Sequence, residues 1–536
     1  FRFSMRLISI LLLALLSSYV ASHKILVYNS QYGHSHSNFL GNIADILVDA
    51  GHDVTSFIPI IDPTVKDGTS KSKKVFLAQS KETKQFLDEM MEHKADFFSM
   101  NNFDAIVTFF VSKVFAKQFV YQCKAVIEEK ELLKKFQAEK FDVMIVENFD
   151  MCGVGYAHLV KPKSLITSGA SSPFSYMFEE FGVPTALSYN PSSYMSSLNV
   201  HSMADRAWNI YADFLMHAIF YPGRWMIEEL YREKIGADFP SLQEISSHAA
   251  YTLVNSEPLI DFATPTLNRV IPIGGIGAKA PKPLDKYWNE VLSRRSKTIL
   301  LSFGSVAKSV YLPDAVKQSI LTTIGSFPEV TFIWKYEEPE DDFGKSATAA
   351  LPNLVLSSWM PQNDLLNDER ITLFITHGGM GSTQETALRG RPGIFIPIFG
   401  DQPRNAGMMQ HNGFGKVIDK FDLHKPEVVI AAIKEILGNE SYKKNAARIS
   451  KMLAKKPFTS KEQLIKTIEF AGEYGPSRAL RPQSYDMTFI EYHNLDICAA
   501  FIVFSLLSLF ITKKFLCCLY KKCCGSKKEE KKSKKE

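Results

Sequence analysis

Short apolar runs alternate with longer amphipathic stretches along most of this chain. Runs of four to eight residues rich in Val, Ile and Phe are typical of buried β-strands, whereas apolar positions spaced three to four apart, as in FLGNIADILVDAG (39–51), are typical of helices. In the first half the runs are KILVYN (24–29), HDVTSFI (52–58), FDAIVTF (103–109), FDVMIVE (141–147) and KSLITS (163–168). This alternation predicts the strands of a parallel sheet, separated by helices.

The same pattern repeats after IPIGGIGAKAPKPL (271–284), whose prolines and glycines are typical of a linker. The later runs are TILLSFGS (298–305), EVTFIWKY (329–336), LVLSSW (354–359), LFITHG (373–378) and GIFIPIF (393–399). Each half therefore predicts a doubly wound α/β domain of Rossmann type, the first over 23–280 and the second over 281–490. With 536 residues, 46% of them hydrophobic, the chain is long enough to bury two such cores.

Both ends of the chain carry apolar segments of another kind. Residues 1–22 combine Arg6, an apolar run and small residues around Ala21, which predicts a secretory signal peptide. Residues 497–512 lack charge, and we expect a transmembrane helix over 495–515 followed by a lysine-rich tail over 516–536. By the positive-inside rule the tail faces the cytosol, so the body is expected to be lumenal in a single-pass type I arrangement.

Single residues refine this view of the compartment. Lys532 and Lys534 resemble a dilysine retrieval signal for the endoplasmic reticulum, although a lysine-rich tail also supplies that spacing by chance. Cys123 and Cys152 are the only cysteines of the body, and a disulfide between them is allowed in the lumen but does not follow from the sequence. The other five are candidates for palmitoylation, and Asn439, in NES, is a candidate glycosylation site.

The distribution of charge excludes one class of partner. The formal net charge is +5, but the last sixteen residues hold eight Lys and three Glu, and four further basic residues lie in the apolar ends. Residues 23–496 therefore carry a formal charge of −4. Since binding to a phosphate backbone requires a basic patch on the folded body, we expect no nucleic-acid partner.

The stretch 359–405 holds the densest chemistry. The run LFIT (373–376) predicts a strand, His377 and two glycines predict a turn, and the residues from Ser382 onward favour a helix. A strand, a glycine turn and a helix start bring backbone N–H groups and the positive helix end to one point, where a phosphate binds. A plain loop is the simpler interpretation of a histidine with two glycines taken alone.

Neighbouring residues add what a nucleotide-sugar requires. Trp359 and Gln362 offer an indole face and an amide for a uracil ring, whereas a core tryptophan is the alternative. Glu385, two helical turns beyond His377, could reach a ribose diol, or it could be a solvated surface carboxylate. Asp401 and Gln402 follow an apolar strand, at the carboxyl end where α/β sheets bind ligands, and suit sugar hydroxyls.

The residues WMPQNDLL, FITHGGMGSTQE and GRPGIFIPIFGDQPRN of this stretch resemble the signature of the UDP-glycosyltransferases, which include the membrane-bound UDP-glucuronosyltransferases of animals. The resemblance implies a GT-B architecture, with the two domains facing across a cleft. It assigns uracil to Trp359 and Gln362, ribose to Glu385, the sugar to Asp401 and Gln402, and the diphosphate to His377, Gly379, Ser382 and Ser305. Members of the family often have Asn where this chain has Gly381, which would remove one side-chain contact. A serine capping the following helix is the alternative for Ser305.

The resemblance also points to a base in the first domain. The loop QYGHSHSNFL follows the first strand, and His36 falls on the family's catalytic histidine, with His34 a loop neighbour. A histidine suits general-base catalysis near neutral pH. The family orients this histidine with an aspartate after a later strand, where this chain has Glu147. Either Glu147 or Asp150 could take that role, and a strand-end carboxylate paired with a lysine is the alternative for Glu147.

Together these features imply inverting, metal-independent transfer of a glucuronosyl or glucosyl group from a UDP-sugar to a hydroxyl of a small lipophilic acceptor. The UDP-sugar is then a co-substrate, and no cofactor or metal is expected. Arg404 and Arg391 are candidates for holding a glucuronate carboxylate. The aromatic-rich region 171–230 is compatible with a lipophilic pocket, a membrane-facing surface or plain core. Homo- or hetero-oligomers with related transferases are possible partners, and the alternative function is a non-catalytic UDP-sugar or lipid-binding relative that regulates such transferases.

Overall fold

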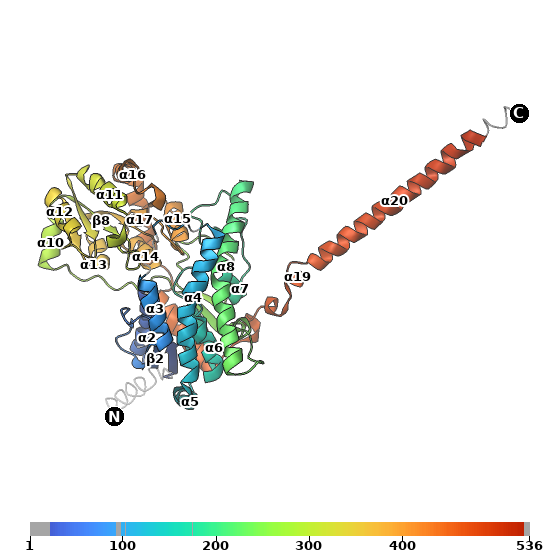
Figure 1. Cartoon of the computed structure of the whole chain (residues 1–536), viewed down its shortest axis with the longest axis horizontal. Coiled ribbons are helices and arrows are strands. Elements are labelled where there is room, and N and C mark those ends of the chain that lie inside the picture. The colour runs from blue at the N-terminus through green and yellow to red at the C-terminus, as the bar shows by residue number, and fades with distance from the viewer. Residues whose placement is uncertain (1–21, 93–97, 102, 174, 530–536) are drawn as a thin grey trace, which may run out of the picture. The chain divides into compact units, whose positions relative to one another are not determined.

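The computed structural model describes residues 22–92, 98–101, 103–173 and 175–529. The predicted signal peptide, apart from Ser22, and the end of the predicted tail with Lys532 and Lys534 lie outside these residues. Residues up to Arg481 form one compact unit, and Pro482–Glu536 form a second. The first unit contains two parallel sheets, each covered by helices (Figure 1).

The first sheet has the strand order β3-β2-β1-β4-β5-β6-β7, and all its paired strands are parallel. Its strands are β1 (Lys24–Tyr28), β2 (Asp53–Pro59), β3 (Lys73–Leu77), β4 (Val143–Glu147), β5 (Ser164–Gly169), β6 (Tyr251–Val254) and β7 (Val270–Pro272). In β1, Leu26 belongs to the apolar core on one face of the sheet and Val27 to the core on the other face. Because both faces are covered, the central strands β1 and β4 are apolar along most of their length, as the sequence pattern predicts.

The helices of this layer are α2 (His34–Asp49), α3 (Lys81–Glu92), α4 (Ala105–Glu128), α5 (Lys130–Glu139), α6 (Met151–Val160), α7 (Ser175–Phe181), α8 (Met203–Lys234) and α9 (Leu242–Ser247). The strand predicted over 103–109 is wrong, because these residues begin helix α4. The Asp104 side chain caps the helix by accepting from the N–H groups of Ile106 and Val107. The run of Ile, Val and Phe suggested a strand, but α4 and α8 lie side by side, and this tertiary packing decides the conformation (Figure 1).

The second sheet has the order β10-β9-β8-β11-β12-β13, which is the strand order of a dinucleotide-binding fold. Its strands are β8 (Lys297–Ser302), β9 (Val330–Lys335), β10 (Leu354–Ser357), β11 (Ile371–Thr376), β12 (Gly393–Phe395) and β13 (Gly415–Val417). Its helices are α10 (Lys286–Leu292), α11 (Asp314–Gly325), α12 (Asp342–Ala350), α13 (Gln362–Asn367), α14 (Met380–Arg389), α15 (Gln402–His411), α16 (Pro426–Gly438) and α17 (Glu440–Ala454). The five strands predicted in this half are all present.

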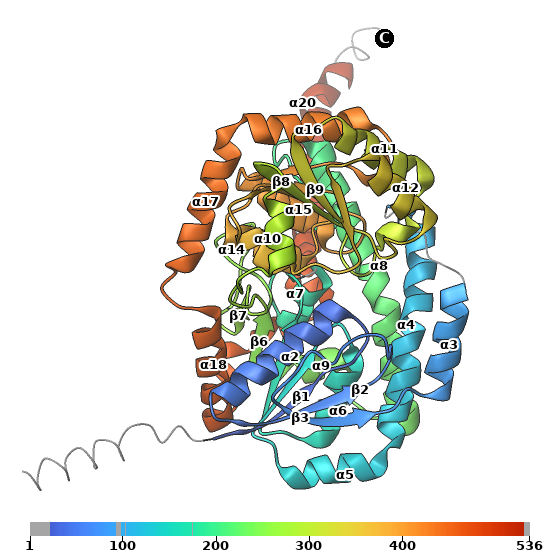
Figure 2. The same ribbon diagram turned by 90° about the vertical axis from the view of Figure 1, so that its left-hand side faces the viewer.

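Helix α18 (Ser460–Tyr474) returns from the second sheet to the first (Figure 2). Leu464, Ile468 and Ala471 are fully buried in the core that contains Ile25 and Val27 of β1. The Ser164 hydroxyl also donates to the Ala471 carbonyl, at 2.6 Å. The last helix of the first compact unit therefore completes the core of the first sheet.

The second compact unit contains α19 (Phe489–Tyr492) and α20 (Leu495–Glu529). Within α20, residues Leu495–Cys523 are long and apolar enough to cross a membrane, with a mean hydropathy of 2.3 in their most apolar window. This helix includes the predicted span over 495–515 and continues into the predicted tail.

Candidate active site

The loops at the carboxyl ends of the strands bring His36 and Glu147 into contact. His36 lies in the first turn of α2, after β1, and Glu147 is the last residue of β4, the strand that pairs with β1. The Nδ1 atom of His36 is 2.6 Å from Oε1 of Glu147. Because an ionised carboxylate only accepts hydrogen bonds, this contact assigns the proton to Nδ1 and leaves Nε2 as an acceptor.

Glu147 is buried, and its oxygens have further donors. The Tyr32 hydroxyl donates to Oε2 at 2.9 Å, and the Ala170 N–H donates to Oε1 at 3.1 Å. Asp150, the other carboxylate considered from the sequence, instead accepts from the Ser30 hydroxyl and from the Cys152 N–H at the start of α6. Burial raises the pKa of Asp150 to about 6. Of the two carboxylates, therefore, Glu147 contacts His36 and Asp150 caps a helix.

Aromatic rings surround the His36 imidazole. The rings of Tyr32 and Phe149 have their centroids 4.7 and 4.8 Å from that of His36. Phe149 also contacts Phe220 of α8 and Phe115 of α4, at centroid distances of 5.3 and 6.3 Å. A hydroxyl compound that reaches His36 would therefore meet an apolar wall drawn from three elements.

On the second sheet, His377 is held between two glycines at the end of β11. A Cβ atom on Gly304 would lie 2.6 Å from Cε1 of His377, and one on Gly379 would lie 2.6 Å from its Nε2. Gly304 also has φ +86°, a left-handed conformation that favours glycine. Burial, together with the nearby Lys335 ammonium, lowers the pKa of His377 to about 4. The imidazole is therefore neutral at physiological pH.

Helix α14 begins directly after this turn, with Gly379 as its N-cap residue. The N–H groups of its first turn and the positive end of the helix lie beside His377, which suits an anion. A Cβ atom on Gly381 would meet nothing within 4 Å, so the asparagine common in the family would fit at this position. Its absence removes a side chain from the site but leaves the backbone N–H.

Gln362, Ser382 and Glu385 meet at the start of α13 and along α14. The Nε2 atom of Gln362 donates to Oε2 of Glu385 at 2.7 Å and to the Ser382 hydroxyl at 3.1 Å. Burial raises the pKa of Glu385, which the Gln362 bond partly offsets. Trp359, just after β10, is 75% exposed and is therefore not a core tryptophan. An indole face, an amide and a carboxylate thus belong to neighbouring elements.

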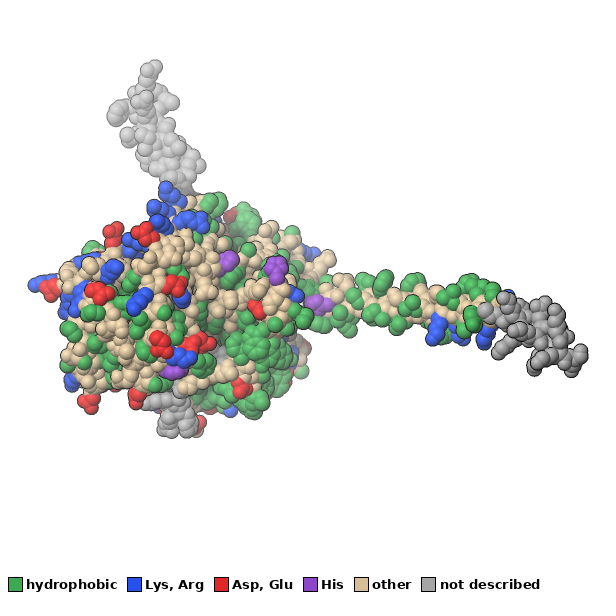
Figure 3. Space-filling view, turned by 90° about the horizontal axis from the view of Figure 1, so that it is seen from above, with side chains coloured by type: hydrophobic (Ala, Val, Ile, Leu, Met, Phe, Trp, Pro, Cys, Tyr) green, Lys and Arg blue, Asp and Glu red, His purple; other side chains and the backbone are tan. Residues whose placement is uncertain are grey.

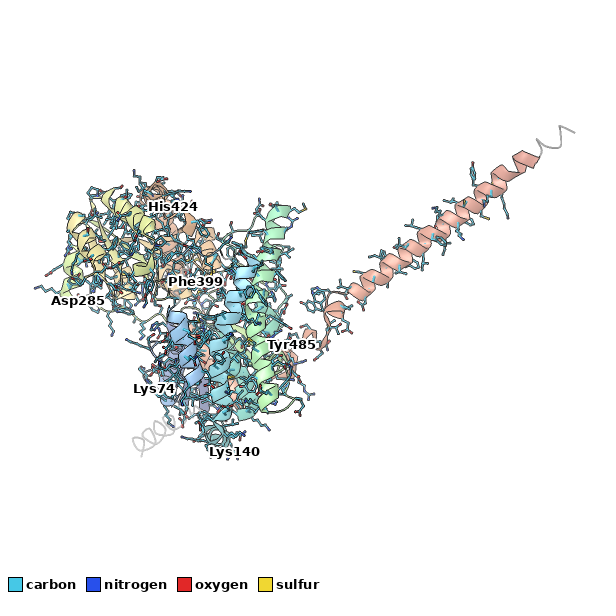
Figure 4. The ribbon with its side chains drawn as sticks, in the orientation of Figure 1. Lys74, Lys140, Asp285, Phe399, His424 and Tyr485 are labelled. Carbon is cyan, nitrogen blue, oxygen red and sulfur yellow. A yellow bond between two sulfur atoms is a disulfide. The ribbon has the colours of Figure 1, made fainter. Side chains whose placement is uncertain are left out.

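Asp401 and Gln402 follow β12 and begin α15, and Figure 4 marks their loop by its label on Phe399. Burial raises the pKa of Asp401, whereas a hydrogen bond from Asn405 and the charge of His36 act in the opposite direction. His36 and Asp401, from the two sheets, are therefore within electrostatic range of each other. The Oε1 atom of Gln402 accepts from the N–H groups of Ile398 and Phe399 and so holds the loop itself.

Ser305 lies exposed in the turn after β8, four residues before the start of the short 3-10 helix Ser309–Tyr311. Lys308 is the N-cap residue of that helix, and no side chain caps it. The alternative interpretation of Ser305 as a helix cap is therefore wrong. Its hydroxyl lies in the same turn as Gly304, against which His377 packs.

Two residues of the site were not predicted. Lys335 ends β9, and its ammonium donates to the Gly304 carbonyl. Its pKa is lowered by burial, although Glu337 opposes this at 3.7 Å. The second residue that was not predicted is Tyr32, which contacts both His36 and Glu147. The sequence did contain a sign of each residue. Lys335 ends an apolar run, and Tyr32 is an aromatic residue close to two histidines.

His34 is the first residue of α2. Burial lowers its pKa, while the Asp62 carboxylate opposes this effect and the Lys335 ammonium adds to it. His34 therefore lies within electrostatic range of Lys335 from the second sheet, and no hydrogen bond joins it to Glu147 in the described contacts.

The two arginines predicted to hold a glucuronate carboxylate are engaged elsewhere. Arg404 is 3% exposed and forms an ion pair with Asp261 at 2.9 Å. Arg391 donates to the carbonyls of Leu366 and Asn367 at the end of α13. Among the described residues, no group of three or more His, Cys, Asp and Glu side chains is arranged to hold a metal ion.

A disulfide bond joins two helices of the first domain next to the candidate site. Cys123 of α4 and Cys152 of α6 are bonded, with their Cα atoms 5.6 Å apart. Cys152 follows Asp150 by two residues, so the bond joins α4 to the loop that carries Glu147 and Phe149. The pairing that the sequence left open is therefore present.

Comparisons with known proteins agree with this geometry. The family described as "UDP-glucoronosyl and UDP-glucosyl transferase" matches residues 23–530. The chain is 29% identical to putative UDP-glucuronosyltransferase ugt-48 of Caenorhabditis elegans over 481 residues, which cover 89% of this chain and 91% of the relative. It is 30% identical to UDP-glucuronosyltransferase 3A1 of Bos taurus over 502 residues, which cover 91% and 92%.

Solved glycosyltransferases share the fold. A UDP-glucosyltransferase from Polygonum tinctorium capable of glucosylating indoxyl, in complex with 3,4-dichloroaniline, has a TM-score of 0.56 at 15% identity and covers 84% of this chain and 99% of its own. The calicheamicin glycosyltransferase CalG4 has a TM-score of 0.54 at 14% identity, with 85% and 100% covered. The likeness confirms the GT-B fold. The chain thus belongs to the UDP-glucuronosyl and UDP-glucosyl transferase family and is a glycosyltransferase.

Proposed function

We propose that the protein transfers a glucosyl or glucuronosyl group from a UDP-sugar to the hydroxyl of a small lipophilic acceptor, with inversion at the anomeric carbon. The observation that carries this proposal is the His36–Glu147 pair, whose imidazole lies within electrostatic range of Asp401 on the second sheet. A base on one sheet and nucleotide-sugar ligands on the other suit a direct displacement between two bound substrates.

His36 is the general base of the proposed reaction. With its Nδ1 proton held by Glu147, the Nε2 atom takes the proton of the acceptor hydroxyl as the acceptor oxygen bonds to C1 of the sugar. The bond from C1 to the phosphate oxygen breaks on the opposite face, and UDP leaves with the electron pair. Glu147 stabilises the imidazolium that forms.

The residues after β8, β9 and β11 hold the departing diphosphate. The start of α14 supplies backbone N–H groups, Ser305 and Ser382 supply hydroxyls, and Lys335 supplies a positive charge. Lys335 is needed because His377 is neutral and contributes hydrogen bonding without charge. This assembly can balance the leaving charge with groups of the chain itself, which supports the metal-independent scheme.

The environment of Asp401 favours glucose over glucuronate as the donated sugar. A glucuronate carboxylate near Asp401 would meet a like charge, and Arg404 and Arg391 are engaged with Asp261 and with the end of α13. A neutral hexose needs only the hydroxyl contacts that Asp401 and the Gln402 amide offer.

The apolar wall around His36 supports a lipophilic acceptor, a phenol or an alcohol. The apolar helix within α20 supports a membrane anchor, and we propose residence in the endoplasmic reticulum membrane with the two sheets in the lumen. Asn439, exposed at the N-cap of α17, is then accessible to glycosylation. The disulfide between Cys123 and Cys152 supports an oxidising compartment.

The test uses the membrane-bound protein, a panel of phenols and alcohols, and radiolabelled UDP-glucose and UDP-glucuronate. We expect glucoside formation by the wild type, and a His36→Ala variant that binds UDP with unchanged affinity but loses turnover. If the wild type and the variant bind UDP equally and neither transfers sugar across the panel, the non-catalytic binding function is correct instead. Product with UDP-glucuronate but not UDP-glucose would overturn the choice of sugar alone.

A further inference from the structure

Helix α4 turns apolar side chains outward along its first half. The side chains that it buries there are small or polar, namely Thr108, Ser112 and Ala116, which follow one another at intervals of four residues. Its exposed side chains include Ile106, Phe109, Phe110 and Val114, which are 41–71% exposed. An ordinary surface helix buries its apolar stripe, so the pattern of α4 is reversed.

Helix α8, which lies beside α4, has apolar side chains on two sides. It buries Leu215 and Met216 in the core, and it exposes Ile210, Phe214, Tyr221 and Trp225, which lie on one stripe and are 53–61% exposed. Trp208, at 46% exposed, lies in the turn before this stripe. Figure 3 shows hydrophobic side chains gathered over this part of the folded body. We call the exposed side chains of these two helices the α4–α8 apolar face.

An exposed apolar surface on two adjacent helices requires an occupant, whereas single exposed apolar residues do not. Between residues 105 and 127, α4 carries Lys113, Lys117 and Lys124 and no acidic residue. On α8, two tryptophans and a tyrosine are exposed. Lysines and amphipathic aromatic rings beside an apolar stripe are the composition of a helix that lies in a membrane interface.

The chain also keeps the folded body near a bilayer. The first compact unit ends at Arg481, and the apolar helix α20 begins at Leu495. The connecting segment, 482–494, spans at most about 45 Å even when fully extended. A face of the body that binds lipid would therefore always have a membrane within reach.

The α4–α8 apolar face continues inward to the candidate site. Phe115, 39% exposed on α4, has its ring centroid 6.3 Å from that of Phe149, and Phe149 contacts His36. Phe220 of α8 contacts Phe149 from the other helix. Apolar side chains thus line the way from the exposed surface to the imidazole.

We propose that the α4–α8 apolar face lies in the interface of the lipid bilayer that α20 spans, with Trp208 and Trp225 among the acyl chains and headgroups. Lipophilic acceptors then reach His36 from the lipid phase along the aromatic side chains that α4 and α8 contribute, and this second statement rests on the proposed function. A second copy of the chain is the competing occupant of the face.

Tryptophan fluorescence tests the contact with lipid. The chain has five tryptophans, of which Trp288 and Trp334 are buried, Trp359 is at the candidate donor site, and α20 has none. We would reconstitute the full chain in nanodiscs of phosphatidylcholine and phosphatidylserine with or without brominated acyl chains. Brominated acyl chains are expected to quench the tryptophan fluorescence of the wild type and of a Trp359→Phe variant. The fluorescence of Trp208→Phe/Trp225→Phe is expected to be the same in both lipids.

Equal emission from the wild type in both lipids would overturn the proposal, as would quenching that persists in the double variant. Cross-linking of two copies through α8 in lipid, without quenching, would assign the face to a dimer. These measurements need no turnover, so they stand or fall apart from the proposed function.

A pair of exposed substitutions tests the route of the acceptor. Phe110→Glu/Phe214→Glu is expected to raise the KM for a bilayer-partitioned phenol at least tenfold and to leave the KM for the UDP-sugar and the KM for a water-soluble phenol unchanged. Tyr287→Glu, at a half-exposed residue of α10, is the matched control and should change none of the three. An equal rise for both phenols would show that the face does not guide acceptors from lipid.

Discussion

Replacing Glu147 by Gln removes the charge beside His36 and keeps a side chain of the same size. In the proposed reaction His36 becomes an imidazolium next to a carboxylate whose oxygen is 2.6 Å from its Nδ1 atom. Two opposite unit charges about 4 Å apart attract by about 4 kcal/mol at an effective dielectric constant near 20. A neutral amide retains part of this through its dipole, so we expect the barrier to rise by about 2 to 4 kcal/mol.

This rise corresponds to a fall in kcat of about 30- to 1000-fold. Glu147→Asp keeps the charge but shortens the side chain by one methylene, and we expect a smaller fall, of about 10-fold, because the carboxylate no longer reaches Nδ1. Both variants should bind UDP as the wild type does, because Glu147 touches none of the donor residues. Initial rates at saturating UDP-sugar and calorimetric titration with UDP measure the two quantities.

Asp150→Asn is the matched control, since Asp150 is buried within three residues of Glu147 and contacts Ser30 and Cys152 instead of His36. Its kcat should stay within about threefold of the wild type. The reasoning is refuted if Glu147→Gln, with an unchanged Tm, retains kcat within threefold, or if Asp150→Asn loses as much as Glu147→Gln does.

Three further perturbations have defined outcomes. Trp359→Ala should weaken UDP binding by about 1 to 3 kcal/mol, the range for stacking a base on an aromatic ring, without lowering the Tm, and calorimetry measures both. His377 has a folded pKa of about 4, below its unfolded value, so its contribution to stability is present above the unfolded pKa and is lost as the pH falls from about 6.5 toward 4. Urea unfolding should show a loss of roughly 2 kcal/mol between pH 7 and 5 that His377→Asn lacks. Cys123→Ser/Cys152→Ser opens a loop of 29 residues and should cost about 4 kcal/mol in the same assay; a cost under 1 kcal/mol would mean that packing alone fixes α4 to α6.

Much of the fold could be predicted because both sheets are parallel and buried on both faces. Their strands, such as β8 and β11, are therefore continuous apolar runs bounded by polar turns. The start of α4 was mistaken for a strand because its apolar residues point outward, so no buried helical stripe is visible at 103–109. The strands β3, β6, β7 and β13 were missed because their sequences, KKVFL, YTLV, VIP and GKV, are short or partly charged. Strand β7 overlaps the start of the stretch 271–284, which was predicted as a linker.

The features of the candidate site that depend on local sequence could be predicted. His36, Gln362, Ser382 and Asp401 lie on the loops and helix starts where parallel strands end, which is a property of the topology. The choice between Glu147 and Asp150 required tertiary structure, because both lie within one loop and only distances to His36 separate them. Ion pairs such as Arg404–Asp261 join residues far apart in the chain, and the sequence gives no sign of them.

The return of α18 to the first sheet has a consequence for how the chain is made. The core around Ile25 and Val27 includes Leu464, Ile468 and Ala471, so the first sheet cannot finish folding until residue 471 has left the ribosome. At about 5 to 20 residues per second, the roughly 200 residues after β7 take about 10 to 40 s to synthesise. During that interval the earliest part of the protein exposes an apolar surface, while the second sheet, synthesised later, can fold first. Nascent chains halted before and after α18 should therefore differ in chaperone retention far more than their small difference in length would suggest.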